Sequence, residues 1–195
     1  MQIFTFLFLM LGPFKIIAPF AKITRNATPT LTKQIALRAS LYSAGALLLA
    51  GLLGQRIISS YGIPIPILAI SGGIILFLVA LLNVIKQFDT HATHDDIVAE
   101  PTLSMAMNPL AFPSIVTPYG IAALIVFLSI SPDMNAKMTV GAIVLAIMIV
   151  NLVVMLLTRY IYRPLALVFA ILGVVLGVVQ VALGLLIIYN QTRAL

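Results

Sequence analysis

The chain has 195 residues, of which 62% are hydrophobic and only 8% are charged. Soluble domains carry about 25% charged residues, so this chain has too few to cover a water-exposed surface. Its net charge of +6 includes 11 Lys and Arg residues spread along the sequence, which is typical of membrane flanks and not of a nucleic-acid patch. No cysteine is present, which excludes disulfides and thiolate metal sites.

Six apolar segments, each long enough to cross a bilayer, follow one another along the chain. Because these runs lack the alternation of a membrane β-barrel, we expect an all-α membrane protein with six transmembrane helices in contact with lipid. The first segment has no basic leading region and no cleavage site, so we interpret it as a membrane helix and not as a signal peptide. The expected segments are residues 3–23, 36–57, 67–85, 103–130, 138–160 and 165–189.

Prolines interrupt two of these segments. Pro13 and Pro19 lie in the first segment, and Pro109, Pro113 and Pro118 lie in the fourth. Each proline removes a backbone donor and clashes with the preceding turn, so we expect the first and fourth helices to be broken. Non-helical backbone at membrane depth is tolerated only where protein buries it or where it lines a cavity.

The two broken segments occupy corresponding positions in two halves of the chain. We expect one domain, 1–195, with a pseudo-repeat at about 1–88, a linker at about 89–102 and a second pseudo-repeat at about 103–190. Because each half has three segments, an odd number, the second repeat must be inverted relative to the first. Paired interrupted segments of this kind indicate the solute site of a transporter.

The distribution of Lys and Arg predicts the orientation in the membrane. The loops after the first, third and fifth segments hold Lys22, Arg25, Lys33, Arg38, Lys86, Arg159 and Arg163. The opposite side holds Arg56, Lys137 and Arg193. This bias places the long loops in the cytoplasm and both termini in the periplasm, with a tight basic turn at 159–164 between the last two segments.

Lys15 is the only ionisable residue near the middle of a segment. An intramembrane charge costs about 2.5–3.5 kcal/mol on insertion scales, so it usually faces a cavity or a partner. One interpretation is that Lys15 pairs with an anionic group of a solute, because no acidic residue lies in any apolar segment. The alternative is that its side chain extends to the membrane interface.

The broken stretches offer further groups to a solute or an ion. Freed carbonyls attract cations, and helix N-termini attract carboxylates. We predict a substrate or ion site formed by Gly12, Pro13, Lys15, Pro19, Asn108, Pro109, Pro113, Ser114, Thr117 and Pro118. The alternative is a structural kink, since proline is commoner in membrane helices than in soluble ones.

Polar and small residues inside the segments have packing interpretations. Asn83, Asn151 and Gln180 are single amides, for which we expect hydrogen bonds between helices, with Asn83 directed into the bundle or to an interface. Gly173 and Gly177 have the spacing of a dimer motif, so a homo-oligomer contact is an alternative to packing within the chain. Small residues that would let another helix approach the second segment closely are Ser40, Ala44, Gly51 and Gly54.

The sequence contains no convincing motif for a metal site or for catalysis. His91, His94, Asp95 and Asp96 superficially suggest a metal cluster, but zinc sites need three or four convergent ligands, and we expect a solvated loop. No nucleophile–base pair, P-loop or dinucleotide fingerprint is present, so we expect neither an enzyme nor a cofactor. With all five acidic residues in loops, coupling to Na⁺ and uncoupled export both stay open.

Three motifs together resemble those of the MarC (UPF0056) family of integral membrane proteins. The stretches that carry the likeness are Pro109-Leu110-Ala111-Phe112-Pro113 through Pro118-Tyr119-Gly120, Ile70-Ser71-Gly72-Gly73-Ile74-Ile75-Leu76-Phe77, and Gly12-Pro13 with Phe20. They are similar to the family patterns P-L-A-[IF]-P…G-P-G, A-G-G-I-L-L-F and [ND]-P-x-G-x-x-P-x-F. The likeness covers nearly the whole chain.

This chain departs from the family pattern at both broken segments. Gly12 replaces the usual Asn or Asp, Lys15 stands where Gly is frequent, and Pro19 comes one position late. Thr117 and Tyr119 replace the glycines that flank the last proline. The resemblance implies a six-helix protein of the bacterial inner membrane, and some relatives are described as transporters of small neutral amino acids.

Two functions from different classes are open on the sequence. The first is a secondary transporter or exporter of a small neutral or zwitterionic solute such as an amino acid, with its site between the two broken helices. The second is a non-transporting membrane scaffold or partner subunit. The chain carries no soluble binding domain and only one long polar loop, which favours the first.

Overall fold

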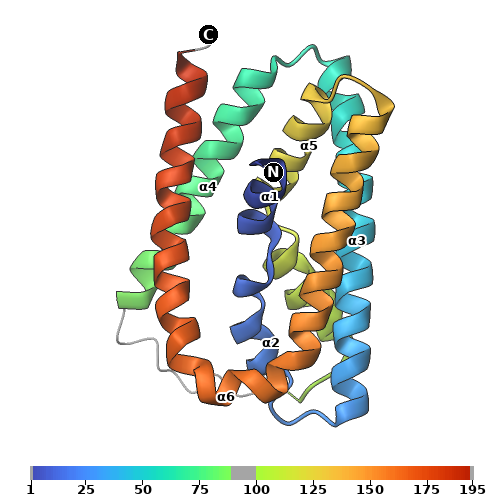
Figure 1. Ribbon diagram of the computed structural model, residues 1–195, viewed down its shortest axis with the longest axis vertical. Helices are drawn as coiled ribbons and strands as arrows, with labels where there is room; N and C mark the ends of the chain where they lie inside the picture. The colour runs from blue at the N-terminus through green and yellow to red at the C-terminus, as the bar shows by residue number, and fades with distance from the viewer. Residues whose placement is uncertain (1, 89–99, 194–195) are drawn as a thin grey trace.

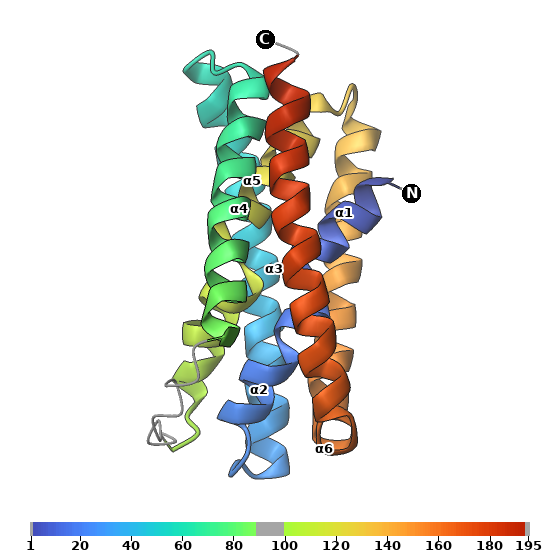
Figure 2. The same cartoon turned by 90° about the vertical axis from the view of Figure 1, so that its left-hand side faces the viewer.

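The computed structural model describes residues 2–88 and 100–193, and all regular structure within them is helical. The helices run along the long axis of the molecule in Figures 1 and 2, with α1 inclined to the others. The elements are α1 (Gln2–Leu11), η1 (Pro13–Lys15), α2 (Ile17–Ile23), α3 (Pro29–Ser60), α4 (Ile65–Phe88), η2 (Leu103–Ala106), η3 (Met107–Ile115), α5 (Pro118–Ile130) and α6 (Met134–Thr192). The all-α class predicted from composition is confirmed.

Five stretches of the described chain are long and apolar enough to cross a membrane. They are Ile3–Ile23, Pro29–Ser60, Ile65–Ile85, Met134–Thr158 and Ile171–Thr192. A sixth crossing is reached if the bent pair Leu103–Ile115 and Pro118–Ile130, inclined at 62°, counts as one span. The protein is therefore a multi-pass membrane protein, and both predicted helix breaks are present. Whether its two halves are inverted repeats stays a prediction.

Two segment boundaries differ from the sequence prediction. The helix that holds the second segment begins at Pro29, ahead of the expected apolar span 36–57, at the start signal that Thr28 as N-cap and Pro29 at N1 form in the sequence. The Thr28 Oγ1 accepts a hydrogen bond from the Leu31 amide at 3.3 Å. The expected tight turn at 159–164 is wrong, since the backbone there is helical and α6 is continuous from Met134 to Thr192. Figure 1 shows α6 running down one side, bending and returning beside α4. Pro164 lies in this stretch, where a lost backbone donor bends a helix without ending it.

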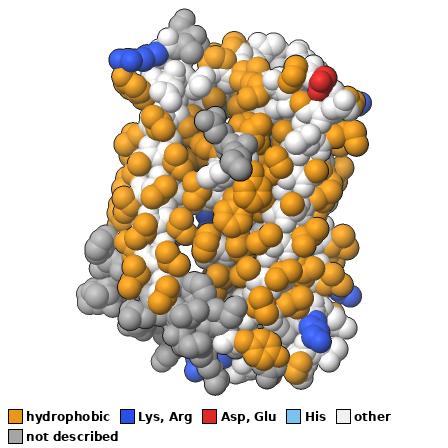
Figure 3. Space-filling view, in the orientation of Figure 1, with side chains coloured by type: hydrophobic (Ala, Val, Ile, Leu, Met, Phe, Trp, Pro, Cys, Tyr) orange, Lys and Arg blue, Asp and Glu red, His pale blue; other side chains and the backbone are white. Residues whose placement is uncertain are grey.

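Apolar side chains cover the outside of the bundle at mid-height. Leu37, Leu41, Leu49 and Leu52 of α3 are each more than half exposed, as expected of a surface in contact with lipid. Figure 3 shows hydrophobic side chains over the middle of one face, with most Lys, Arg and acidic side chains toward its ends. This exterior fits a bilayer and not water.

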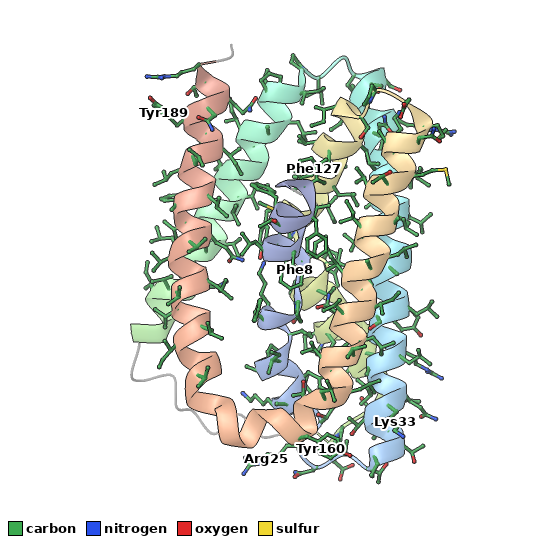
Figure 4. All side chains as sticks on the ribbon, in the orientation of Figure 1. Phe8, Arg25, Lys33, Phe127, Tyr160 and Tyr189 are labelled. Carbon is green, nitrogen blue, oxygen red and sulfur yellow. The ribbon has the colours of Figure 1, made fainter. Side chains whose placement is uncertain are left out.

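The ends of the bundle carry different groups. Figure 4 shows Arg25, Lys33 and Tyr160 at the end where α6 bends, and Tyr189 toward the end where the chain terminates. The C-terminus lies at the same end as the short connections α3–α4 and α5–α6 (Figure 1). Tyrosine near both ends matches the aromatic belts of membrane proteins. Which end faces the cytoplasm stays a prediction.

Small residues set the close helix contacts. A Cβ added at Gly54 would lie 2.3 Å from Ile125 Cδ1, and one at Gly51 would lie 2.8 Å from Leu128 Cδ1, so α5 packs directly on α3. A Cβ at Gly184 would lie 2.8 Å from the Phe77 amide nitrogen, which brings α6 against the backbone of α4. The predicted close approach to the second segment is confirmed at Gly51 and Gly54.

The two glycines of the possible dimer motif, Gly173 and Gly177, differ in how closely other residues approach them. A Cβ at Gly177 would lie 2.9 Å from Val84 Cγ2, so this glycine packs within the chain against α4. Gly173 has open space around the same position. The contact of Gly177 supports the packing interpretation, and an oligomer contact stays untested.

Candidate functional site

The first helix ends at Gly12 for a steric reason. Gly12 has an extended backbone (φ −75°, ψ 171°), as the residue before a proline usually does. A Cβ on Gly12 would lie 2.1 Å from the Phe8 carbonyl oxygen, so only glycine fits at this position. Since the chain leaves the helix here, the last carbonyls of α1 have no partner within their own helix.

Three side chains satisfy three consecutive carbonyls at this helix end. Gln180 Nε2 donates to the Leu9 carbonyl at 3.0 Å, and Asn151 Nδ2 donates to the Leu11 carbonyl at 2.8 Å. The Lys15 ammonium donates to the Met10 carbonyl, between them, at 2.7 Å. The prediction that Asn151 and Gln180 form hydrogen bonds between helices is confirmed. These three carbonyls already accept from the protein's own side chains, and one of the donors is the Lys15 ammonium, so whether a free cation binds at the breaks stays a prediction.

Asn83, the third of these amides, differs from Asn151 and Gln180 in its burial. Its side chain is exposed on α4, although Gly73, Leu76 and Ala80 on the same helical stripe are buried. Of the two predicted directions for Asn83, the one into the bundle is therefore wrong, and an interface with another molecule stays a prediction. Asn83 lies in the last turns of α4 (Ile65–Phe88).

The fourth segment is broken by the same local rule as the first. Asn108 (φ −128°, ψ 121°), Phe112 (φ −130°, ψ 125°) and Thr117 (φ −102°, ψ 148°) are all extended, and each precedes a proline. The Asn108–Pro109 and Phe112–Pro113 peptide bonds are cis. Helical turns therefore form only between these residues, and the segment does not become one continuous helix.

The helix after the last break begins at a buried cap. Thr117 Oγ1 accepts a hydrogen bond from the Gly120 amide at 3.2 Å, and the Thr117 side chain is buried. A Cβ on Gly120 would lie 2.5 Å from Leu11 Cδ2, so the start of α5 packs against the end of α1. The two predicted breaks therefore meet in the folded chain.

Lys15 and Tyr119 join the two breaks. The Lys15 ammonium donates a hydrogen bond to the Tyr119 hydroxyl and lies 4.4 Å from the centre of the tyrosine ring. Tyr119 is buried and Lys15 is half-buried, so the ammonium is held at the break by these contacts. Within the described residues, the hydrogen-bond partners of this ammonium are a hydroxyl and a carbonyl, and neither carries a charge.

The structure brings together part of the predicted site. Gly12, Pro13, Lys15 and Thr117 lie at the junction of the two breaks, and Gly12, Pro13 and Thr117 are buried there. Pro19 is half-buried in the first turn of α2.

The remaining predicted residues lie away from Lys15. The exposed ones are Asn108, Pro109, Pro113 and Pro118. Ser114 is half-buried, and its hydroxyl donates to the Pro109 carbonyl at 2.8 Å, within its own segment. The segment that holds most of these residues, η3, packs mainly on α3 and touches the first broken helix less extensively, through α2. These side chains are not gathered around the ammonium.

Tyr119 was missing from the predicted site, although the sequence held a signal for it. Lys15 and Tyr119 are both positions at which this chain departs from glycine in the family motifs, and the structure places the two departures in contact. The replacement of two glycines by bulky polar residues, one in each broken segment, marked both positions in the sequence, but only the structure shows that they are in contact.

A cavity of about 130 Å³ adjoins the junction. It lies between α1, α4, α5 and the end of α6, and its lining includes Met10 and Tyr119, the two residues that hold Lys15. Most other lining side chains are apolar or small. The site thus combines a cation without a charged partner and an apolar space beside it.

No metal site is found in the part of the chain that the structure describes, where no group of three His, Asp, Glu or Cys residues converges. The predicted solvated loop with His91, His94, Asp95 and Asp96 lies outside the described residues. One buried acceptor near the junction is unpaired: Asn151 Oδ1 has no hydrogen-bond partner among the described residues.

Comparison with known proteins identifies relatives along the chain. A family model described as MarC family integral membrane protein matches residues 1–193. The UPF0056 inner membrane protein MarC of Salmonella arizonae is 29% identical over 120 residues, which cover 58% of this chain and 54% of that protein. A UPF0056 membrane protein of Methanocaldococcus jannaschii is 28% identical over 138 residues, 70% of this chain and 67% of the relative. The match thus spans little more than half of the Salmonella protein. No solved structure matches.

Proposed function

The chain belongs to the MarC family of integral membrane proteins, and on that premise we propose that it is a secondary transporter or exporter. Its solute is small and neutral or zwitterionic, such as an amino acid, and it binds where the two broken helices meet. The observation that carries the proposal is Lys15, a cation at membrane depth with only neutral partners among the described residues.

The environment of Lys15 supports a carboxylate as its transient partner. An intramembrane charge costs about 2.5–3.5 kcal/mol on insertion scales, so it is retained where it serves a purpose. Hydrogen bonds between ionised groups are roughly twice as strong as neutral ones. A solute carboxylate would therefore displace the Tyr119 hydroxyl from the ammonium, while the Met10 carbonyl keeps the ammonium in place.

The unpaired Asn151 Oδ1 supports a zwitterionic solute. Its amide nitrogen donates to the Leu11 carbonyl, which directly follows the carbonyl that accepts from Lys15. Buried acceptors without a donor are rare and need an explanation. In this proposal the ammonium group of the solute donates to Asn151 Oδ1 during transport, so the carboxylate and the ammonium are recognised by different helices.

The arrangement of the spans supports the same proposal. Two broken segments that meet near the centre of a bundle are the usual setting of a transporter site, and the proposed inverted repeat relates them. No acidic residue lies in an apolar segment, so coupling to Na⁺ or uncoupled export is consistent with the chain, whereas a carboxylate proton relay is not. The proposed location is the bacterial inner membrane, the site named for the Salmonella relative.

The test is transport by the purified full-length chain in proteoliposomes. Radiolabelled alanine, valine and glycine are loaded on one side, and their movement is followed with and without a Na⁺ gradient. The proposal expects saturable movement that is lost in the double variant Lys15→Gln, Thr117→Ala. Transport that this variant leaves unchanged would remove the site. Absence of transport, together with stoichiometric recovery of a partner protein, would support the scaffold function instead.

A further inference from the structure

The cavity beside Tyr119 is lined mainly by apolar groups, in contrast to the charged Lys15 ammonium nearby. Apart from Tyr119 and Gln191, its lining consists of apolar side chains and glycines from four helices. At about 130 Å³, the cavity is close to the roughly 150 Å³ of an apolar cavity that stays dry and binds benzene. Pockets for drug-sized ligands are larger, about 300–1,000 Å³. The space is partly open, and its volume fits one compact apolar group.

Residues with little or no side chain line the cavity on two helices and let those helices approach closely. Ala69 and Gly72 lie on α4, and Ala122 lies across from them on α5. A Cβ on Gly72 would come within 3.0 Å of the Ala122 Cβ. Larger residues at these positions would fill the space, so these three positions set the size of the group that enters.

The cavity and the cation are joined through the same two residues. Met10 and Tyr119 line the cavity, and Lys15 donates hydrogen bonds to the carbonyl of the first and the hydroxyl of the second. A molecule with a carboxylate at Lys15 can therefore extend an attached group directly into the cavity. Met10 and Tyr119 therefore connect the Lys15 ammonium to the apolar cavity.

We propose that this cavity is the side-chain subsite of the solute site, and that it selects carboxylate solutes carrying a compact branched apolar group. This inference rests on the proposed function and adds to it the feature of the solute that is selected. The carboxylate accepts from Lys15 in place of Tyr119, and the apolar group lies between α4 and α5. A solute without a side chain leaves the cavity empty and binds more weakly.

Calorimetric titration of the purified full-length chain with glycine and with valine tests the subsite. The two probes share their charged groups and differ in the isopropyl group. Because a methylene in an apolar pocket changes affinity by about tenfold or more, valine should bind at least about tenfold more tightly than glycine. Ala122→Leu and Ala69→Leu, which fill the cavity from two helices, should lower the affinity for valine to about that for glycine.

Ala146→Leu is the matched control, because Ala146 is exposed on α6, away from the cavity. It should keep the preference of the wild type. Equal affinities for glycine and valine in the wild type overturn the subsite, as does a preference that survives both cavity variants. Valine that binds with the expected preference but does not move across proteoliposomes overturns the proposed transport function and leaves the subsite intact.

Discussion

The Lys15 ammonium donates a hydrogen bond to the Tyr119 hydroxyl, although the two residues lie in different halves of the chain. Each sits just after the residues that break its helix, and each stands where the family motif has glycine. The contact therefore connects the two broken segments at the point where both have lost regular backbone hydrogen bonds.

Lys15→Gln and Tyr119→Phe should have opposite effects on solute affinity. Loss of the ammonium removes a hydrogen bond between charged groups, worth about 1.5–3 kcal/mol, so an amino acid should bind roughly tenfold or more weakly to Lys15→Gln. Loss of the tyrosine hydroxyl removes the group that the carboxylate must displace, so Tyr119→Phe should bind the solute as tightly as the wild type or more tightly. Titration calorimetry measures both. Equal weakening in the two variants would mean that the pair only supports the fold.

Asn151→Leu and Gln180→Leu should destabilise the protein, because each leaves a carbonyl of α1 without a donor. Hydrogen bonds between membrane helices are worth about 0.6 kcal/mol on average and up to about 1.7 kcal/mol. Asn83→Leu is the control, since the Asn83 side chain is exposed and its loss should not lower stability. Unfolding in mixed micelles compares the three. A loss in Asn83→Leu equal to that in the other two would contradict the assignment.

Gly12→Ala should damage the fold far more than the same change at Gly45. A methyl group on Gly12 meets the Phe8 carbonyl oxygen at 2.1 Å, and that atom belongs to the backbone and cannot rotate away. Gly45 lies within α3 with nothing within 4 Å of its added Cβ, so Gly45→Ala should stabilise by up to about 1 kcal/mol through helix propensity. The yield of monodisperse protein and the unfolding temperature separate the two outcomes. Similar behaviour of the two variants would exclude a close approach at Gly12.

Single-cysteine labelling tests the orientation without background, because the natural chain has no cysteine. From the positive-inside bias, a membrane-impermeant reagent added to intact cells should label Tyr61→Cys, whose side chain is 78% exposed, in the turn between α3 and α4. The same reagent should label Asp95→Cys only after the inner membrane is opened. The reverse pattern would invert the predicted topology.

Helix breaks and helix caps could be predicted from the sequence, because they depend on residues that are adjacent in the chain. The shortage of charge required a membrane, and the residues before Pro13, Pro109, Pro113 and Pro118 became extended for steric reasons that act within two residues. The cap at Thr28 was readable for the same reason. The reversal between the last two segments was predicted as a turn, but its helical backbone was not, because a proline can either end a helix or only bend it, and packing decides which.

The sequence by itself determined that this chain is a helical membrane protein with two broken spans, since composition and proline sterics act without the rest of the fold. Only the tertiary structure decided which polar groups meet. Asn151 and Asn83 are the same residue type in the same kind of apolar helix, yet one caps the Leu11 carbonyl and the other is exposed. Their difference depends on which helix lies alongside, as does the contact of Lys15 with Tyr119. Contacts between distant segments follow from how the helices pack, and no local pattern encodes that packing.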